Sequence, residues 1–264
     1  MENKQPLTAE TKRGDAQELS VHRYSEGGWS KSSAHVPGEM ELTVYINGQE
    51  LVTIMCTPTK LTNLVLGFLL SEGIITSMKD VTMMRVCEDD SLAEVRLTNQ
   101  EFKMPTKRTL TSGCGGGASF TSEGQKVDSK LAISPEEALS LMKQLQDKMD
   151  LYQLSGGVHA SALADTKKLL VVAEDIGRHN TLDKIQGECL LRGLATKDGI
   201  LLSTGRLSSE MVRKAAKMHV PIVISRTSPT GGAIKMANEL SICLVGYARG
   251  NRLIVYSHPK RLGQ

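Results

Sequence analysis

The stretch "GILLSTGRLSSEMVRKAAKMHVPIVISR", residues 199–226, decides the fold. An apolar run, a run with helical spacing and a second apolar run follow one another, and "TGGAIKMANEL" (230–240) and "ICLVGYA" (242–248) repeat the alternation. Strands that are apolar along their whole length and are separated by helices are typical of a parallel sheet covered on both faces. The sequence therefore predicts a parallel α/β layer in the C-terminal part of the chain.

The segments around this layer carry patterns of the same two kinds. Further strands are predicted at 156–165, 168–175 and 252–257, and further helices at 134–149 and 179–193. Ser134 and Glu137 have the spacing of a capping box, and Pro135 suits the first turn, so the start of the first of these helices is well marked. The C-terminal part is thus predicted as an α/β domain over residues 133–264.

The N-terminal half predicts a smaller α+β unit. Two β-rich runs, 41–46 and 49–56, flank Asn47-Gly48, which is the strongest short signal for a hairpin. A helix within "KLTNLVLGFLLSEGII" (60–75) and short strands at 81–87 and 92–97 follow. We assign residues 39–132 to this part, which includes a cysteine loop, and residues 1–38, which are polar, to a flexible arm.

The composition excludes several classes of protein. The net charge is only +3 and aromatic residues make up 3%, so neither a broad basic surface nor stacking platforms for nucleic acid are expected. No apolar run reaches the ~18 residues of a membrane span, and the N-terminal "MENKQPLTAETKRGD" has no signal-peptide pattern. We therefore expect a cytoplasmic protein that binds neither nucleic acid nor a membrane.

The five cysteines have no repeated spacing, which argues against a disulfide framework. Cys56, Cys87, Cys189 and Cys243 lie in apolar patterns and are expected to be buried. Cys114 differs, because it lies in "TSGCGGGASF" (111–120), where few side chains could pack around it. Successive glycine N–H groups can form an anion-binding nest, which favours a thiolate. The pattern indicates a reactive thiol, and a glycine-rich turn that happens to contain a cysteine is the alternative.

Three polar loops are predicted at the carboxyl ends of strands. They contain, in order, Arg178 and His179 in "EDIGRHNTLDK" (174–184), Arg206 in "LSTGRLSSEM" (202–211), and Ser225 and Arg226 in "SRTSPTGG" (225–232). Such ends are where α/β proteins bind ligands, and arginines and helix N-termini suit phosphate. Each loop alone could be a capped helix start or a solvated turn, but together they predict one crevice. His159 is expected to be a structural histidine.

The same motifs carry a resemblance to a known family. "GGVHASAL" (156–163), "EDIGRHNTLDK", "SRTSPT" and "LVGYARGNRLIVY" followed by "HP" occur in this order in the FdhD/NarQ family of sulfur carrier proteins required for formate dehydrogenase. The chain resembles that family from about Glu39 to its C-terminus. The resemblance implies a cytidine deaminase-like three-layer α/β fold with a mixed sheet, preceded here by the N-terminal hairpin and helix, and it implies a homodimer.

The resemblance also implies a function. Members take sulfane sulfur from a cysteine desulfurase and pass it to the bis(molybdopterin guanine dinucleotide) molybdenum cofactor of formate dehydrogenase. A sulfurtransferase-type accessory protein is therefore expected, with the desulfurase, the dehydrogenase and the guanine nucleotide part of the cofactor as partners. The persulfide is expected on Cys114. Cofactor binding is expected at Tyr247, Ala248, Arg249, Gly250, Asn251 and Arg252, with Arg178, His179, Ser225 and Arg226 as further candidates in the same crevice.

The sequence departs from the family pattern at one place. The family's cysteine opens a Cys-x-x-Cys motif, whose second position here is Gly117. One thiol can still hold a persulfide, but release of sulfur by forming a disulfide loses its second thiol. A non-catalytic chaperone for the cofactor is therefore the main alternative, and an unrelated thiol hydrolase is a weaker one.

Deamination and zinc are not expected. Zinc deaminases need a glutamate two residues after the first ligand and a Pro-Cys-x-x-Cys pair. The corresponding residues are His159-Ala160-Ser161, and the sequence contains no Cys-x-x-Cys.

Overall fold

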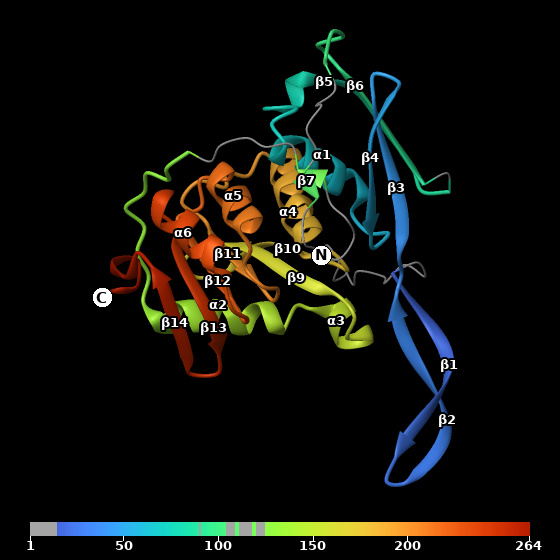
Figure 1. Ribbon diagram of the computed structural model, residues 1–264, viewed down its shortest axis with the longest axis vertical. Helices are drawn as coiled ribbons and strands as arrows, with labels where there is room; N and C mark the ends of the chain where they lie inside the picture. The colour runs from blue at the N-terminus through green and yellow to red at the C-terminus, as the bar shows by residue number, and fades with distance from the viewer. Residues whose placement is uncertain (1–14, 90, 104–108, 111–117, 120–124) are drawn as a thin grey trace, which may run out of the picture.

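The computed structural model describes residues 15–89, 91–103, 109–110, 118–119 and 125–264 (Figure 1). Cys114 and Gly117 lie outside the described residues. The short strands β7 (Thr109–Leu110) and β8 (Ala118–Ser119) pair on either side of that gap.

The larger unit is built on a six-stranded mixed sheet with the order β10-β9-β11-β12-β13-β14. Its strands are β9 (His159–Ala164), β10 (Leu169–Asp175), β11 (Ile200–Ser203), β12 (Ile222–Ser225), β13 (Cys243–Arg249) and β14 (Arg252–Ser257). β11, β12 and β13 are parallel, as predicted, while β9 and β14 run the opposite way. β10 is antiparallel to β9 and so points in the same direction as β11.

Helices cover both faces of this sheet (Figure 1). One face carries α4 (Arg178–Arg192), α5 (Ser209–Lys217) and α6 (Gly231–Glu239), and the other carries α2 (Pro135–Gln146). Along β11 the side chains alternate, since Leu201 packs in the core under α4–α6, while Ile200 and Leu202 pack in the core under α2. This burial on both sides explains why the strand is apolar throughout. The predicted α/β fold with a mixed sheet is confirmed, and so is the capping box of Ser134 and Glu137.

The smaller unit has a four-stranded sheet with the order β4-β3-β6-β5. Its elements are β3 (Met40–Ile46), β4 (Gln49–Cys56), α1 (Leu61–Ser71), β5 (Val81–Cys87) and β6 (Leu92–Leu97). The turn between β3 and β4 has Asn47 at φ 51° and Gly48 at φ 80°, the left-handed pair that a two-residue hairpin requires. The remaining helical segments are α3 (Asp150–Ser155), η1 (Met78–Asp80) and η2 (Pro259–Leu262).

Helix α1 joins the two units because it packs directly on α4. A Cβ atom on Gly67 of α1 would lie 1.7 Å from the carbonyl oxygen of Asp183, and one on Gly187 of α4 would lie 1.9 Å from that of Asn63. The two helix backbones therefore touch at positions where only glycine fits. Buried side chains on all sides of α1 agree with this position between a sheet and a helix.

Replacing Gly67 by alanine should destabilise the protein by at least ~2 kcal/mol, because overpacked contacts cost about 1–3 kcal/mol and the blocking atom here is backbone. Urea unfolding followed by circular dichroism measures the change. Gly231→Ala is the matched control, since nothing lies within 4 Å of a Cβ atom at that helical position. Equal stability of the two variants would contradict the close approach of α1 and α4.

Buried polar contacts also connect the units. Lys184 on α4 forms an ion pair with Asp175 at 2.6 Å, and neither side chain has any exposed surface. Its Nζ also donates to the carbonyl oxygen of Thr57, just after β4. On the other side of α4, Asp183 pairs with Lys214 of α5 at 2.6 Å and accepts a hydrogen bond from Ser71 of α1.

The N-terminal arm is more regular than predicted. The sequence analysis assigns residues 1–38 to a flexible polar arm without predicting strands in it, and β1 (Ala16–Ser25) and β2 (Gly28–Pro37) form a long antiparallel hairpin there. Alternating Ser, Val, His and Tyr residues give the strands, and Glu26 and Gly27, both at positive φ, form the turn. The sequence analysis therefore missed the two strands of this segment. In the part of the chain that the structure describes, no helix is long and apolar enough to cross a membrane.

Candidate functional site

The strand directions bring several loops to one edge of the six-stranded sheet. β10, β11, β12 and β13 all end there, and the antiparallel strands β9 and β14 begin there. The register confirms this, because Asp175 at the end of β10 pairs with His159 at the start of β9, and Arg249 pairs with Arg252. Polar side chains from distant parts of the sequence are thereby collected at one place.

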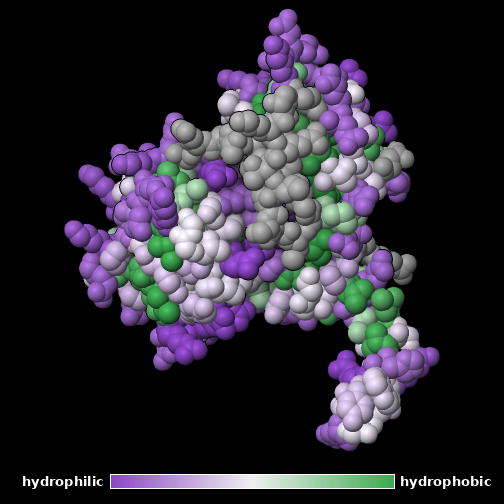
Figure 2. All heavy atoms as spheres, in the orientation of Figure 1, coloured by the Kyte–Doolittle hydropathy of each residue, from purple (hydrophilic) through white to green (hydrophobic). Residues whose placement is uncertain are grey.

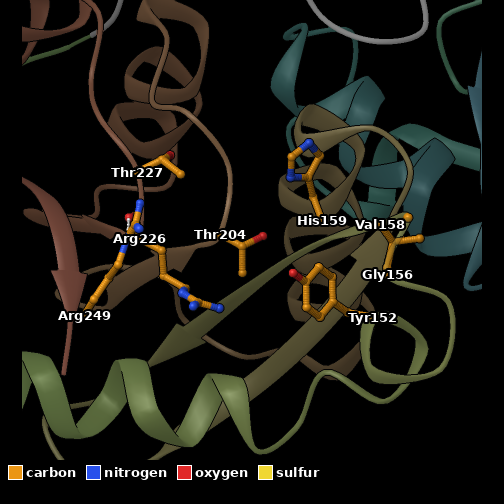
Figure 3. A pocket seen from close by; sticks show the side chains of 9 residues that line it. Tyr152, Gly156, Val158, His159, Thr204, Arg226, Thr227 and Arg249 are labelled. Atoms are coloured by element: carbon orange, nitrogen blue, oxygen red, sulfur yellow. Dashed lines mark hydrogen bonds between the residues drawn. The ribbon is translucent and has the colours of Figure 1, made fainter. Parts of the chain in front are cut away.

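A cleft of about 480 Å³ opens at this edge. Its lining residues are Tyr152, Gly156, Gly157, Val158, His159, Thr204, Arg226, Thr227 and Arg249. In Figure 3 the two arginines lie on one wall, Tyr152 and His159 lie on the opposite wall, and Thr204 lies between them. None of these described lining residues is acidic, and the volume is within the range of small-molecule sites, so the cleft suits an anionic ligand.

The arginines are held by backbone carbonyl groups. Arg249 Nε donates to the carbonyl oxygen of Arg226 at 2.7 Å, and the N–H of Arg226 donates to the carbonyl oxygen of Ser203 at 3.1 Å. Tyr247 takes a left-handed conformation, φ 53°, from which its N–H donates to Thr227. The β13–β14 hairpin is therefore fixed against the end of β12, which preorganises the guanidinium group of Arg249 and the backbone of Arg226.

Ser225 lies beneath the arginine side of the cleft. It is fully buried, and its hydroxyl donates to the carbonyl oxygen of Gly205 at 2.7 Å while accepting from the N–H of Thr227 at 3.1 Å. The loops after β11 and β12 are therefore tied together beneath the cleft. Ser225, predicted as a binding residue, is placed as a support for the cleft and does not line it.

His159 lines the opposite side of the cleft, and Arg178, a predicted binding residue, is buried beside it and is not among the lining residues. Both pack on Gly205, where a Cβ atom would lie 3.1 Å from Arg178 Cβ and 3.2 Å from His159 Nδ1. Burial and the charge of Arg178 lower the pKa of His159, and the carboxylate of Asp175 offsets this only in part. A neutral imidazole therefore lines the cleft, able to accept or donate a hydrogen bond.

His179 is placed away from the cleft. Its Nε2 lies 3.2 Å from the hydroxyl of Ser208, which caps α5, and 3.4 Å from a carboxylate oxygen of Glu210. Burial, followed by the charges of Lys214 and Arg178, lowers its pKa to about 3. His179 thus joins α4 to α5 as a neutral side chain and is not among the lining residues.

Much of the polar block at 174–184 serves the fold. Glu174 accepts hydrogen bonds from the N–H groups of Leu151 and Tyr152, which fixes the start of α3 beside the cleft. Asp175 accepts from the N–H groups of Thr57 and Gly177, and from the amide of Asn180. These contacts position the rim of the cleft and join the end of β4 to β10.

The rest of the predicted C-terminal stretch is divided between several environments. Tyr247, Arg249 and Arg252 line a second, smaller pocket of about 360 Å³ with Leu253 and Ile254. Ala248 is buried in the core on the α2 side. Gly250 and Asn251 form the turn of the hairpin. Only Arg249 belongs to both pockets.

Several lining positions escaped the sequence analysis. His159 was expected to be structural, and Tyr152, Thr204 and the Gly156-Gly157 pair drew no functional assignment. The signal available for them was weak, because it depended on β9 running antiparallel to its neighbours. The glycine pair before a strand was the one feature that indicated a close approach of backbone.

The buried thiols are poor candidates for chemistry. Burial raises the pKa of Cys56 and of Cys243 to about 12, and that of Cys189 to about 11. A thiol reacts as the thiolate, so these three stay inert near neutral pH. Cys87 is only partly buried, and the predicted nucleophile Cys114 lies outside the described residues.

The position that would need a proton-shuttling glutamate for deamination holds a buried hydroxyl. Ser161 forms hydrogen bonds with Thr181 at 2.7 Å and with Ser203 at 3.2 Å. Within the described ranges, no three His, Cys, Asp or Glu side chains are grouped so as to hold a metal ion.

Comparison with known proteins identifies the family of this chain. The FdhD/NarQ family model matches residues 37–263. The chain is 43% identical to the sulfur carrier protein FdhD of Bacillus subtilis over 92% of this chain and 95% of that protein, and 36% identical to that of Staphylococcus aureus over 92% and 94%. The crystal structure of a proposed formate dehydrogenase accessory protein from Desulfotalea psychrophila is similar, with a TM-score of 0.76 and 26% identity over 94% of this chain and 99% of that one. The chain belongs to the FdhD/NarQ family.

Proposed function

We propose that this protein is a sulfur carrier for the maturation of formate dehydrogenase. It receives sulfane sulfur from a cysteine desulfurase as a persulfide on Cys114 and delivers it to the bis(molybdopterin guanine dinucleotide) molybdenum cofactor. Relatives at 36–43% identity are named as sulfur carrier proteins, and the similar solved structure is that of a proposed formate dehydrogenase accessory protein. The observation on which the proposal mainly rests is the basic cleft at the strand ends.

The lining residues of the cleft fit a guanine nucleotide end of the cofactor. Arg226 and Arg249 supply charged donors for phosphate oxygens, and Thr204, Thr227 and Tyr152 carry hydroxyl groups for a base or a sugar. Their backbones are held by hydrogen bonds that do not involve a ligand, so little ordering is needed on binding. The cofactor is the substrate of this reaction, and the cleft is where the chain would hold it.

The first step of the proposed sulfur transfer needs only one thiol on this chain. The Cys114 thiolate attacks the terminal sulfur of the desulfurase persulfide, whose S–S bond breaks as the desulfurase thiolate leaves. The new S–S bond on Cys114 conserves the oxidation state. Delivery as sulfide needs two electrons, and Gly117 cannot provide them by forming a disulfide. We therefore propose that the acceptor or an external thiol supplies these two electrons.

The cleft should bind GDP and discriminate against ATP, because a wrong base leaves buried polar groups unpaired. Arg226→Ala and Arg249→Ala should each weaken GDP binding by ~1–3 kcal/mol, the value of a hydrogen bond to a charged group. Titration calorimetry measures both effects. Arg85→Ala is the control, since Arg85 is exposed on β5 in the other sheet. Equal affinity for GDP and ATP would contradict the recognition of guanine.

The sulfur step is tested by mass spectrometry after incubation with a desulfurase and cysteine. A gain of one sulfur atom on the peptide that contains Cys114 is expected, because Cys114 is the proposed persulfide carrier. The peptides with Cys56, Cys189 and Cys243 should stay unmodified and serve as internal controls. An unmodified Cys114 together with GDP binding would favour the non-catalytic chaperone, which binds and delivers the cofactor without moving sulfur.

A further inference from the structure

Tyr152 is an aromatic side chain that the packing of the protein does not use. Its exposed fraction is 38%, and it belongs to none of the three hydrophobic core clusters formed by the described residues. The buried neighbour Leu151 anchors α3 instead. The ring of Tyr152 lies on a wall of the cleft, opposite Arg226 and Arg249 (Figure 3). Such a ring offers a ligand a flat apolar face and a polar tip.

The backbone that carries this ring is fixed before any ligand binds. The carboxylate of Glu174 accepts hydrogen bonds from the N–H groups of Leu151 at 2.9 Å and of Tyr152 at 2.8 Å. After α3, the backbone of Gly157 lies against the base of the β1–β2 arm, since a Cβ atom at this position would be 2.9 Å from Pro37 Cγ. Little conformational entropy is therefore lost when a ligand packs on the ring.

The wall around Tyr152 carries no charge. The glycine pair 156–157 and Val158 contribute no polar side chain to it. His159 completes the wall, and burial, followed by the charge of Arg178, lowers the pKa of its imidazole, which is therefore neutral near pH 7. A planar, uncharged ring with polar edges fits this wall, because it can stack on the tyrosine and form hydrogen bonds with the imidazole.

The opposite wall carries positive charge. Figure 2 shows hydrophilic side chains gathered over the tip of the β13–β14 hairpin, which contains Arg249. Arg249 Nε donates to the carbonyl oxygen of Arg226 at 2.7 Å. The described residues supply no acceptor for its two terminal nitrogen atoms, which can therefore bind phosphate oxygens. The cleft thus has one cationic wall and one uncharged aromatic wall.

A nucleotide is divided in the same way, with charged phosphates at one end and a planar base at the other. We infer that Tyr152 is the stacking platform for the guanine base, and that the phosphates lie at Arg226 and Arg249. Thr204 lies between the two walls (Figure 3), where its hydroxyl can bind the sugar. The inference rests on the proposed function and adds to it the orientation of the nucleotide in the cleft.

Tyr247 is the competing platform, because it is also 38% exposed and lies beside Arg249. The guanidinium group of Arg249 lies over its ring, 5.8 Å from the centre, so one face of that ring is already covered. Its pocket is also smaller, about 360 Å³ against about 480 Å³, and Leu253 and Ile254 make it more apolar. A base with polar edges therefore fits the wall of Tyr152 better.

Titration calorimetry with GDP and with inorganic pyrophosphate separates the two walls. Tyr152→Ala should weaken GDP binding on the order of 10- to 100-fold, the usual loss when a base no longer stacks on an aromatic side chain. The same variant should bind pyrophosphate as the wild type does, because pyrophosphate has no base. Tyr152→Phe keeps the ring and should retain most of the GDP affinity, while Arg249→Ala should weaken the binding of both ligands.

Leu154→Ala is the matched control for α3. Leu154 is 43% exposed on the same helix and is not among the residues that line the cleft, so this variant should bind both ligands normally. Equal weakening of GDP and pyrophosphate by Tyr152→Ala would overturn the inference, and so would an unchanged affinity of that variant for GDP. The proposed function would survive either result, since the wild type would still bind GDP.

The wild type distinguishes the remaining outcomes. Binding of GDP without any binding of pyrophosphate would overturn the placement of the phosphates at the arginines, and with it the orientation inferred here. A wild type that binds neither ligand would contradict the nucleotide site of the proposed function and this inference together.

Discussion

Replacing Cys114 by alanine should leave the client formate dehydrogenase inactive although it still contains molybdenum. The proposed transfer has one covalent step on this protein, and alanine has no atom that can attack a persulfide. The cofactor would still bind, because the cleft is formed by residues of other segments. The test is to produce the dehydrogenase with each variant in cells that lack their own carrier, and to measure its activity and its metal content.

Two controls make this result specific to the sulfur step. Cys87→Ala removes a thiol that is only partly buried and should leave the client active. The free energy of unfolding of Cys114→Ala should lie within about 0.5 kcal/mol of the wild type, as for substitutions that disturb no packed feature. Full client activity with Cys114→Ala would contradict the carrier and favour the chaperone.

The α/β domain was largely predictable because its strands are buried on both faces. Ile200, Leu201 and Leu202 lie on alternating sides of the sheet and all are buried, so the apolar run is a direct consequence of the layers. The Asn47-Gly48 turn and the capping box at Ser134 were predictable for a similar reason, since each depends on a few adjacent residues. Sequence patterns are sufficient to predict a feature that depends on only a few adjacent residues.

The site was predictable only in part because it depends on directions of distant strands. Arg226 and Arg249 were found from strand ends, but His159 reaches the same edge only because β9 runs antiparallel. The polar segment 174–184 caused the opposite error, because it was predicted to bind a ligand and much of it serves the fold. Asp175 and Lys184 have the residue types of a ligand site, yet they neutralise each other inside the protein. A single sequence does not distinguish a charged residue that binds a ligand from one that forms an ion pair inside the protein.

The two strands of the arm were not recognised because they lack the usual core-facing pattern. Most β1 residues are exposed, so the strand carries no continuous apolar face that would distinguish it from a polar tail. The signal that existed was the alternation of β-branched and aromatic residues around Glu26-Gly27.

Replacing Lys184 by methionine should destabilise the protein by about 3–5 kcal/mol, because the change leaves a buried carboxylate without its countercharge. Lys184 pairs with Asp175 at 2.6 Å, and its Nζ also donates to Thr59 and to the carbonyl oxygen of Glu174. Asp175 would keep three neutral donors, the N–H groups of Thr57 and Gly177 and the amide of Asn180, but it would lose its ion pair with Lys184.

Lys60→Met is the matched control for this variant. Lys60 pairs with Glu188 at the same distance, 2.6 Å, but its side chain is 40% exposed, so water replaces the lost partner and the cost should be about 0–1 kcal/mol. Chemical unfolding of both variants measures the difference. The double variant Asp175→Asn/Lys184→Met should cost less than the sum of its single changes, since the two groups interact directly. Equal costs for Lys184→Met and Lys60→Met would mean that the Asp175–Lys184 pair is reached by water, and the rim of the cleft would then lack the rigid support assigned to it here.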